Sequence, residues 1–245
     1  MARAREKERV VFITQARRGS SRLPGKILET VEGRTLLEWF LLRASRIGSV
    51  DLWCVATTEA PGDDAVAEVV RRAFPSFVVV RGSERDVLGR YAQAMGATDA
   101  HVVVRIASDC PFLDWNLVDE CVALLRREGA DLVKTRREDL PVGLDVEVFR
   151  GEALLRADRE ASDPRHREHV GPYVYEHPEL FRVCFFPYGG EPWPSCRLTL
   201  DYPEDLAFVR AVYGALSPEA PASEVRRYLA QNPQVCAING FRDHG

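Results

Sequence analysis

Short apolar runs alternate along the chain with longer segments in which apolar residues recur at helical spacing. The runs have the length of buried strands and lie at residues 10–13, 52–57, 77–80, 101–106 and 132–135. The segments between them predict helices at about 34–47, 63–74 (capped by Asp63 and Asp64), 82–97 and 116–127. Strands that alternate with helices in this way predict a mainly parallel sheet with right-handed crossovers.

The alternation changes in character after residue 135. Residues 136–141 are charged and irregular, and residues 143–149 alternate between apolar and polar side chains like a strand. Later elements are predicted as helices near 152–160, 167–176, 203–216 and 222–231, and as strands at 181–186 and 196–200. Because no repeat or low-complexity linker interrupts the sequence, we expect one domain over residues 1–245, with an excursion over the site at about 136–194.

Composition and charge restrict the class of protein. A chain of 245 residues can bury a full core, and its 46% hydrophobic and 29% charged residues are ordinary for a soluble globular enzyme. The net charge of -4 argues against a general nucleic-acid binder. Six scattered cysteines without a C-x-x-C pair, no run of membrane-spanning length and no apolar signal core predict a cytoplasmic protein with reduced thiols and no membrane partner.

A cationic loop directly follows the first predicted strand. It is closed by Pro24 and Gly25, and its polar residues are Arg17, Arg18, Gly19, Ser20, Ser21, Arg22 and Lys26. Backbone N–H groups, hydroxyls and cations of this kind bind phosphate oxygens. The loop is neither a Walker A motif nor G-x-G-x-x-G. A solvated basic turn is the plainer alternative, but α/β sheets bind nucleotides at the carboxyl ends of their strands, which favours a nucleoside-triphosphate site.

Two carboxylates follow predicted strands in the same way. Asp109 comes after the run at 101–106, and Asp201 comes after the run at 196–200. If the two face each other across the end of the sheet, they form with phosphate oxygens and waters the kind of Mg²⁺ site that nucleotidyl transfer uses. The alternative for each is an ordinary turn or helix-capping role. We assign such a role to the neighbouring Asp114, Glu204 and Asp205.

The cationic loop also resembles a known signature. The segment Ala16-Arg17-x-Gly-Ser-x-Arg-Leu-Pro-Gly-Lys26 is similar to that of the sugar-nucleotide cytidylyltransferases, which include the acylneuraminate and 3-deoxy-manno-octulosonate cytidylyltransferases. It most resembles their relatives described as spore coat polysaccharide biosynthesis proteins. The resemblance covers nearly the whole chain. It implies a nucleotide-diphospho-sugar transferase-like (Rossmann-like) fold, a three-layer α/β/α sandwich with a mixed, mostly parallel sheet.

The resemblance also implies roles for individual residues. In that family the loop surrounds the triphosphate of CTP, so the implied nucleotide-binding residues are Ala16, Arg17, Gly19, Ser20, Arg22 and Lys26, with Arg17 and Lys26 catalytic. Asp109 matches an Asp-Cys-Pro segment and is implied to be catalytic and to bind Mg²⁺ together with Asp201. Gly82 and Ser83 match a segment that contacts the base or ribose. Arg105 fits a nucleotide contact and an ion-paired core arginine equally well.

Two motifs of the excursion match the family's acceptor side. Asp145 and Glu147 alternate in Pro141-x-Gly-Leu-Asp-Val-Glu and share one strand face. The segment Arg167-Glu168-His169 resembles the acceptor pocket. Arg167 would pair with an acceptor carboxylate or phosphate, and Glu168 or His169 would bind hydroxyls or take the proton of the attacking oxygen. A solvated helix face is the alternative for this second motif.

We therefore expect a cytidylyltransferase that uses Mg²⁺ to transfer CMP from CTP to an acidic sugar such as an ulosonic acid, or to a phosphonate or sugar phosphate. It would release pyrophosphate and act in surface polysaccharide or glycoconjugate biosynthesis. Because relatives are often dimers, a homodimer is expected, with no nucleic-acid partner. Two alternatives remain, a glycosyltransferase that consumes a nucleotide-sugar on the same fold and a non-catalytic nucleotide-binding protein.

Overall fold

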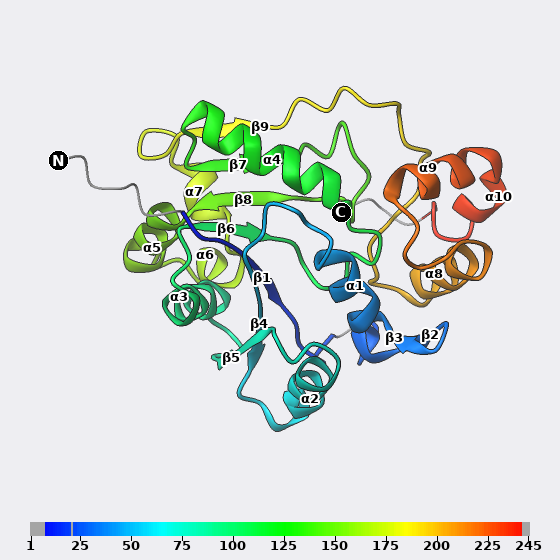
Figure 1. The fold of residues 1–245 in the computed structure, drawn as a ribbon, viewed down its shortest axis with the longest axis horizontal. Helices are drawn as coiled ribbons and strands as arrows, with labels where there is room; N and C mark the ends of the chain where they lie inside the picture. The colour runs from blue at the N-terminus through cyan, green and yellow to red at the C-terminus, as the bar shows by residue number, and fades with distance from the viewer. Residues whose placement is uncertain (1–7, 21, 242–245) are drawn as a thin grey trace.

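The computed structural model describes residues 8–20 and 22–241, so Ser21 of the cationic loop lies outside the described residues. Within them, a seven-stranded sheet has the order β5-β4-β1-β6-β8-β7-β9 (Figure 1). Its strands are β1 Val10–Gln15, β4 Leu52–Thr58, β5 Val78–Gly82, β6 Val102–Arg105, β7 Leu132–Lys134, β8 Glu147–Arg150 and β9 Val183–Phe185. Neighbouring strands are parallel except that β8 is antiparallel to both β6 and β7. The predicted mixed, mostly parallel sheet is confirmed.

Helices cover both faces of this sheet and form two hydrophobic cores. One core is closed by α1 Leu36–Ala44, α2 Asp64–Ala73, α4 Trp115–Glu128, α8 Pro203–Ala215, α9 Ala222–Gln231 and α10 Pro233–Cys236. The other core is closed by α3 Val87–Thr98, α5 Gly151–Glu160 and α7 Pro172–Glu176. Because side chains alternate along a strand, Val10 and Phe12 enter the first core while Val11 and Ile13 enter the second. The predicted α/β/α sandwich is confirmed, and burial on both faces explains the continuous apolar runs.

The strand predicted at residues 196–200 is wrong. This segment belongs to no ladder of the described chain, and its backbone bonds two loops instead. Leu198 N donates to the Val142 carbonyl at 2.8 Å, and Leu200 N donates to the Asp109 carbonyl at 2.9 Å. Gly143 permits the first approach, because its φ is +103° and a Cβ atom there would lie 2.3 Å from the carbonyl carbon of Leu198. The strand predicted at 143–149 is correspondingly confined to β8, and the residues before it make this crossing.

The single helix predicted near residues 167–176 is also wrong. The chain forms α6 Pro164–Glu168 and α7 Pro172–Glu176, with a break at residues 169–171. Pro172 explains the break, because a proline lacks the N–H that would continue a helix but suits the first position of a new one. A short hairpin, β2 Thr30–Val31 and β3 Arg34–Thr35, was not predicted.

Asp63 lies before α2 as predicted, but its carboxylate does not cap that helix. The backbone N–H of Arg18 donates to this carboxylate at 2.6 Å, and the Thr58 hydroxyl donates to its other oxygen. Asp63 is 4% exposed, so it anchors the cationic loop to the end of β4 from a buried position.

The six cysteines are free thiols. None of the helices in the described chain combines the length and the apolarity that a membrane span requires.

Candidate active site

Asp109 and Asp201 lie side by side and share one cation. The Lys26 ammonium donates to Asp109 Oδ2 at 2.7 Å and to Asp201 Oδ1 at 2.9 Å. It also donates to the Leu200 carbonyl at 2.5 Å, and its side chain is only 11% exposed. The convergence of the two carboxylates, which the sequence left conditional, is therefore present in the fold.

Three cations surround Asp201. Arg22 Nη2 lies 3.2 Å from Oδ1, and Arg197 Nη2 lies 3.1 Å from Oδ2, in addition to Lys26. Burial opposes ionisation of Asp201, but Lys26, Arg22 and Arg197 together outweigh it and lower the pKa of this carboxyl group. Burial likewise opposes the charge of Lys26, and the attraction of Asp109 and Asp201 outweighs it and raises the pKa of the ammonium. The site is therefore a network of ionised groups.

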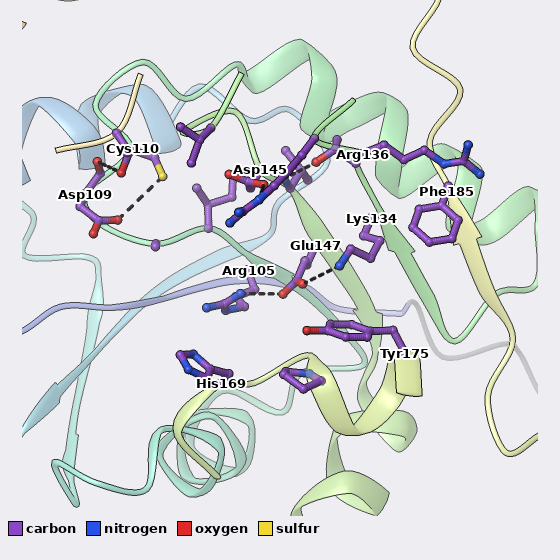
Figure 2. Close-up of a pocket in the computed structure, with 18 of the residues that line it drawn as sticks. Arg105, Asp109, Cys110, Lys134, Arg136, Asp145, Glu147, His169, Tyr175 and Phe185 are labelled. Atoms are coloured by element: carbon purple, nitrogen blue, oxygen red, sulfur yellow. Dashed lines mark hydrogen bonds and ion pairs between the residues drawn. The ribbon is translucent and has the colours of Figure 1, made fainter. Parts of the chain in front are cut away.

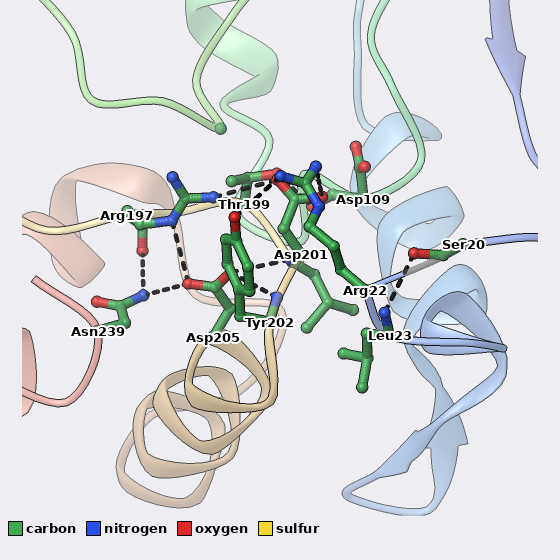
Figure 3. A network of polar contacts seen from close by, with 12 residues as sticks. Ser20, Arg22, Leu23, Asp109, Arg197, Thr199, Asp201, Tyr202, Asp205 and Asn239 are labelled. Carbon is green, nitrogen blue, oxygen red and sulfur yellow. Dashed lines mark hydrogen bonds and ion pairs between the residues drawn. The ribbon is translucent and has the colours of Figure 1, made fainter. Parts of the chain in front are cut away.

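A buried network behind Asp201 fixes its position (Figure 3). Arg197 Nε lies 3.3 Å from Asp205 Oδ1, and Asn239 Nδ2 donates to the same oxygen at 2.9 Å. The other Asp205 oxygen accepts the backbone N–H groups of Asp201 and Tyr202 at 2.9 and 3.0 Å, which confirms its capping role at the start of α8. Sequence reasoning missed Arg197 and Asn239, because neither residue belongs to a motif and only the fold brings them to Asp205.

Two cavities meet at the pair of carboxylates. The loop-side cavity of about 350 Å³ is bordered by the cationic loop and by α3, with Gln15, Arg17, Gly19, Ser20, Arg22, Lys26, Val87, Arg90 and Glu168. The excursion-side cavity of about 760 Å³ is bordered mainly by residues 134–147 and 165–185 (Figure 2). Ala107, Asp109, His169 and Asp201 border both cavities.

The cationic loop is held in shape by its own backbone. Gly25 closes it with a left-handed conformation, φ +73°, and donates its N–H to the Arg18 carbonyl at 3.0 Å. The Ser20 hydroxyl accepts the N–H of Leu23 at 3.3 Å. Four predicted nucleotide-binding residues, by contrast, do not border the loop-side cavity. Ala16 is buried and its N–H donates to the Ala56 carbonyl, Gly82 and Ser83 pack against α3, and Arg105 borders the excursion-side cavity instead.

Arg90 on α3 is a buried guanidinium that the sequence did not single out. It is 1% exposed, it borders the loop-side cavity, and its Nη1 donates to the Ser83 carbonyl at 2.9 Å. Its Nε has no hydrogen-bond partner, and no carboxylate lies within ion-pair distance among the described residues. Burial lowers the pKa of Arg90. In the sequence Arg90 simply follows Leu88 and Gly89, and this combination is not a recognised motif, so sequence reasoning could not have identified it.

In the excursion-side cavity Arg105 is an ion-paired arginine. Its Nη1 lies 2.7 Å from Glu147 Oε2, and Lys134 Nζ lies 3.9 Å from the other oxygen of the same carboxylate. Burial opposes the charge of Arg105, but Glu147 outweighs it and raises the pKa of the guanidinium. Asp145 also borders this cavity, 3.6 Å from Arg137. Asp145 and Glu147 therefore face one space as predicted, although Asp145 lies before β8 and not within the strand (Figure 2).

The structure separates the three residues of the Arg167-Glu168-His169 motif. Glu168 borders the loop-side cavity, and His169 borders both cavities. Arg167 borders neither, because its Nη2 lies 2.6 Å from Asp86 and 2.7 Å from Asp158. We therefore correct its interpretation as an acceptor ligand: Arg167 docks α6 onto α3 and α5.

The donor set suits a divalent cation bound together with a phosphate. Among the described residues no group of three or more His, Cys, Asp or Glu side chains is placed to hold a metal alone. Mg²⁺ is often bound by one or two carboxylates with phosphate oxygens and waters, and two carboxylates that already share one cation fit that arrangement.

Comparison with known proteins identifies the family of the chain. The family model for cytidylyltransferases matches residues 11–231. The spore coat polysaccharide biosynthesis protein SpsF of Bacillus subtilis is 33% identical over 236 residues, which are 92% of this chain and 96% of SpsF. An uncharacterized protein of Methanocaldococcus jannaschii is 34% identical over 237 residues, 94% of either chain. A solved cytidylyltransferase structure from Leptospira borgpetersenii has a TM-score of 0.87 and 30% identity, covering 94% of this chain and 97% of that one. The chain therefore belongs to the cytidylyltransferases, the CTP-dependent nucleotidyltransferases that its cationic loop resembles.

Proposed function

We propose that the protein transfers CMP from CTP to an acidic sugar of the ulosonic acid type, or to a phosphorylated or phosphonate acceptor, and releases pyrophosphate. The observation that carries the proposal is that Asp109 and Asp201 border both cavities. A transferase must bring its two reacting atoms to within about 3–3.5 Å. Two substrates bound in the cation-rich cavity and in the second, larger cavity could bring their reacting atoms together where the two cavities adjoin.

The loop-side cavity suits the triphosphate of CTP. Arg17 and Arg22 border it with half-exposed side chains, and Gly19 and Ser20 offer backbone N–H groups and a hydroxyl. Arg90 supplies a cation that has no ion-pair partner among the described residues and whose Nε has no hydrogen-bond acceptor there. A nucleotide would provide that acceptor, so we include Arg90 among the nucleotide-binding residues.

In the proposed reaction an acceptor oxygen attacks the α-phosphorus of CTP. The bond from that phosphorus to the bridging oxygen breaks, and pyrophosphate leaves in line with the attack. Asp109 and Asp201 would hold the metal, Mg²⁺ in this proposal, which supplies charge neutralisation on the phosphate oxygens. Arg17 and Arg22 offset the charge that develops on the leaving pyrophosphate. His169, at the border of both cavities, is placed to accept the proton of the attacking hydroxyl.

The excursion-side cavity favours an acidic acceptor. Most of its cations already have carboxylate partners, as Arg105 has Glu147 and Arg137 has Asp145. Arg136 differs, because its guanidinium lies 4.5 Å from the centre of the Phe185 ring and pairs with no carboxylate of the described chain (Figure 2). A guanidinium that lies over an aromatic ring and has no carboxylate partner keeps its donors available for a carboxylate or phosphate.

A pyrophosphate-release assay tests this function. Purified protein with Mg²⁺ and each of the four ribonucleoside triphosphates would be offered ulosonic acids, sugar phosphates and phosphonates. Release with CTP and an acidic acceptor supports the proposal and names the substrate. Consumption of a nucleotide-sugar without pyrophosphate release would contradict it and indicate a glycosyltransferase.

A homodimer is part of the same proposal. The strand β9 lies at the end of the sheet order, so one side of its backbone has no neighbouring strand among the described residues. Such an edge is suited to pairing with another chain. Light scattering at micromolar concentration checks this, and a monomer there would contradict it.

A further inference from the structure

The ammonium of Lys26 lies at the point between Asp109 and Asp201 where a metal ion shared by the two carboxylates would lie. We propose that Lys26 is a resident counter-ion of this position. It holds the two carboxylates together before substrates arrive, keeps a divalent cation from binding alone, and yields the position when the metal enters with a triphosphate. The inference rests on the metal site of the proposed function.

Because of its hydrogen bonds, Lys26 cannot hold the two carboxylates and bind a phosphate at the same time. An ammonium group has three N–H donors. In this structure the three acceptors are Asp109 Oδ2 at 2.7 Å, Asp201 Oδ1 at 2.9 Å and the Leu200 carbonyl at 2.5 Å. No donor of Lys26 is left for a phosphate, so the residue cannot bind a triphosphate without first leaving the carboxylates.

The local charge explains why a metal alone is kept out. Asp109, Asp201 and the adjoining Asp205 carry three negative charges, and Lys26, Arg22 and Arg197 carry three positive charges in the same ion-pair network, so the network is already neutral. A lone divalent cation would add two uncompensated positive charges in a half-buried place, where charges interact more strongly than in water. A metal that arrives with a triphosphate brings more negative than positive charge, and the phosphates give the displaced ammonium a new partner.

Among these three cations, Lys26 is the one suited to move. Arg197 is 3% exposed and is also bound to Asp205, so it is fixed from behind. Arg22 touches only Asp201 of the two carboxylates and does not lie between them. Lys26 is the first residue of a short 3-10 helix, Lys26–Leu28, and its four-carbon side chain swings without any change of the backbone. Displacing it couples metal binding to nucleotide binding, and such coupling is reciprocal.

Metal binding in the absence of nucleotide tests the proposal without any catalytic assay. Mn²⁺ would be titrated into the whole protein, and free Mn²⁺ would be followed by electron paramagnetic resonance. Lys26→Met removes the charge but keeps the length of the side chain, and we expect it to bind Mn²⁺ at least about tenfold more tightly than the wild type, within the usual range of such couplings. Lys26→Arg keeps a cation and should show no gain. Lys134→Met, a change of the same kind at the excursion-side cavity, should bind Mn²⁺ like the wild type.

Two further variants separate failure of this inference from failure of the metal site itself. The double variant Lys26→Met with Asp109→Asn should lose the gain, because the metal would have lost one of its two carboxylates. If Lys26→Met gains nothing while Asp109→Asn abolishes Mn²⁺ binding with a non-hydrolysable CTP analogue, the resident counter-ion is overturned and the metal site stands. If Asp109→Asn binds Mn²⁺ and the analogue like the wild type, the metal site of the proposed function fails, and this inference with it. Should Lys26→Met not fold, Lys26→Gln, which keeps a donor without the charge, gives the same comparison.

Discussion

The backbone amide of Leu200 donates to the backbone carbonyl of Asp109 at 2.9 Å, so the segments that carry the Asp109 and Asp201 carboxylates are set side by side by a main-chain bond. The Thr199 hydroxyl reinforces it by donating to the same carbonyl at 3.3 Å. A main-chain contact leaves less freedom than a contact between long side chains, which suits a site whose geometry must be fixed in advance. The spacing of the Asp109 and Asp201 carboxylates is therefore built into the backbone.

Asp109 and Asp114 follow the same strand, and replacing each separates function from stability. We expect Asp109→Asn to lower turnover by about 10²–10³-fold, because it removes a charge from one of the two carboxylates of the proposed metal site, while the melting temperature stays near that of the wild type. The Asp114 carboxylate caps α4 by accepting the backbone N–H of Asn116 at 3.0 Å, and Asp114→Ala removes this cap. It should cost about 1 kcal/mol of stability and leave turnover unchanged. Pyrophosphate release and urea unfolding measure the two effects; undiminished release by Asp109→Asn would refute the role of this carboxylate.

Arg90 and Arg43 are both 1% exposed, but only Arg90 borders a cavity. Arg90→Met should weaken CTP binding by about 10–100-fold, the value of a hydrogen bond to a charged group, and cost little stability because it removes an unpaired buried charge. Arg43 donates to four backbone carbonyls, including those of Leu113 at 3.0 Å and Ala220 at 2.6 Å. Arg43→Met should leave CTP affinity unchanged and cost about 3 kcal/mol. Calorimetric titration with CTP and urea unfolding decide, and equal CTP affinity of wild type and Arg90→Met would remove Arg90 from the site.

Much of the central sheet could be predicted because its chemistry is local. The first strands are buried on both faces and therefore form nearly continuous apolar runs, and the loop after β1 carries the groups that we propose to bind phosphate in one continuous segment. Asp109 and Asp201 could be identified from the sequence for the same reason, since each closely follows an apolar run.

What the sequence did not reveal depends on partners far along the chain. Residues 196–200 alternate between apolar and polar side chains like a strand, but all five are buried and their backbone forms hydrogen bonds with two loops and not with a neighbouring strand. Arg167 lies in a run of polar residues that reads as a solvated or ligand-binding face. Its actual partners, Asp86 and Asp158, are brought to it only by the packing of α6 on its neighbours.

Gly143 and Gly129 both have positive φ angles, and only Gly143 lies against backbone. An alanine at Gly129, φ +59°, meets nothing within 4 Å, so Gly129→Ala should cost about 1–2 kcal/mol from its backbone conformation alone. An alanine at Gly143 has the same disadvantage and also overlaps the backbone of Leu198, so we expect a loss of about 3 kcal/mol or more. Turnover should fall only in Gly143→Ala, because displacing Leu198 also moves Asp201. Unfolding in urea and pyrophosphate release measure both effects; equal losses for the two variants would show that the loop relaxes freely.

Asp201 makes the stability of the protein depend on pH. Its pKa is lowered in the folded chain, so the stabilisation by the ionised carboxylate is fully present above the ordinary carboxyl pKa of about 3.9 and is lost as the pH falls through the lower, folded-state value. We expect Asp201→Asn to be less stable than the wild type at pH 7, and the difference to narrow below about pH 4, where the wild type loses the same charge. Urea unfolding at pH 7, 5 and 3 measures this. Glu138→Gln is the control, because Glu138 is exposed and forms no ion pair among the described residues, so its difference from the wild type should not change with pH. A constant difference for Asp201→Asn would mean that Lys26, Arg22 and Arg197 do not stabilise the ionised form.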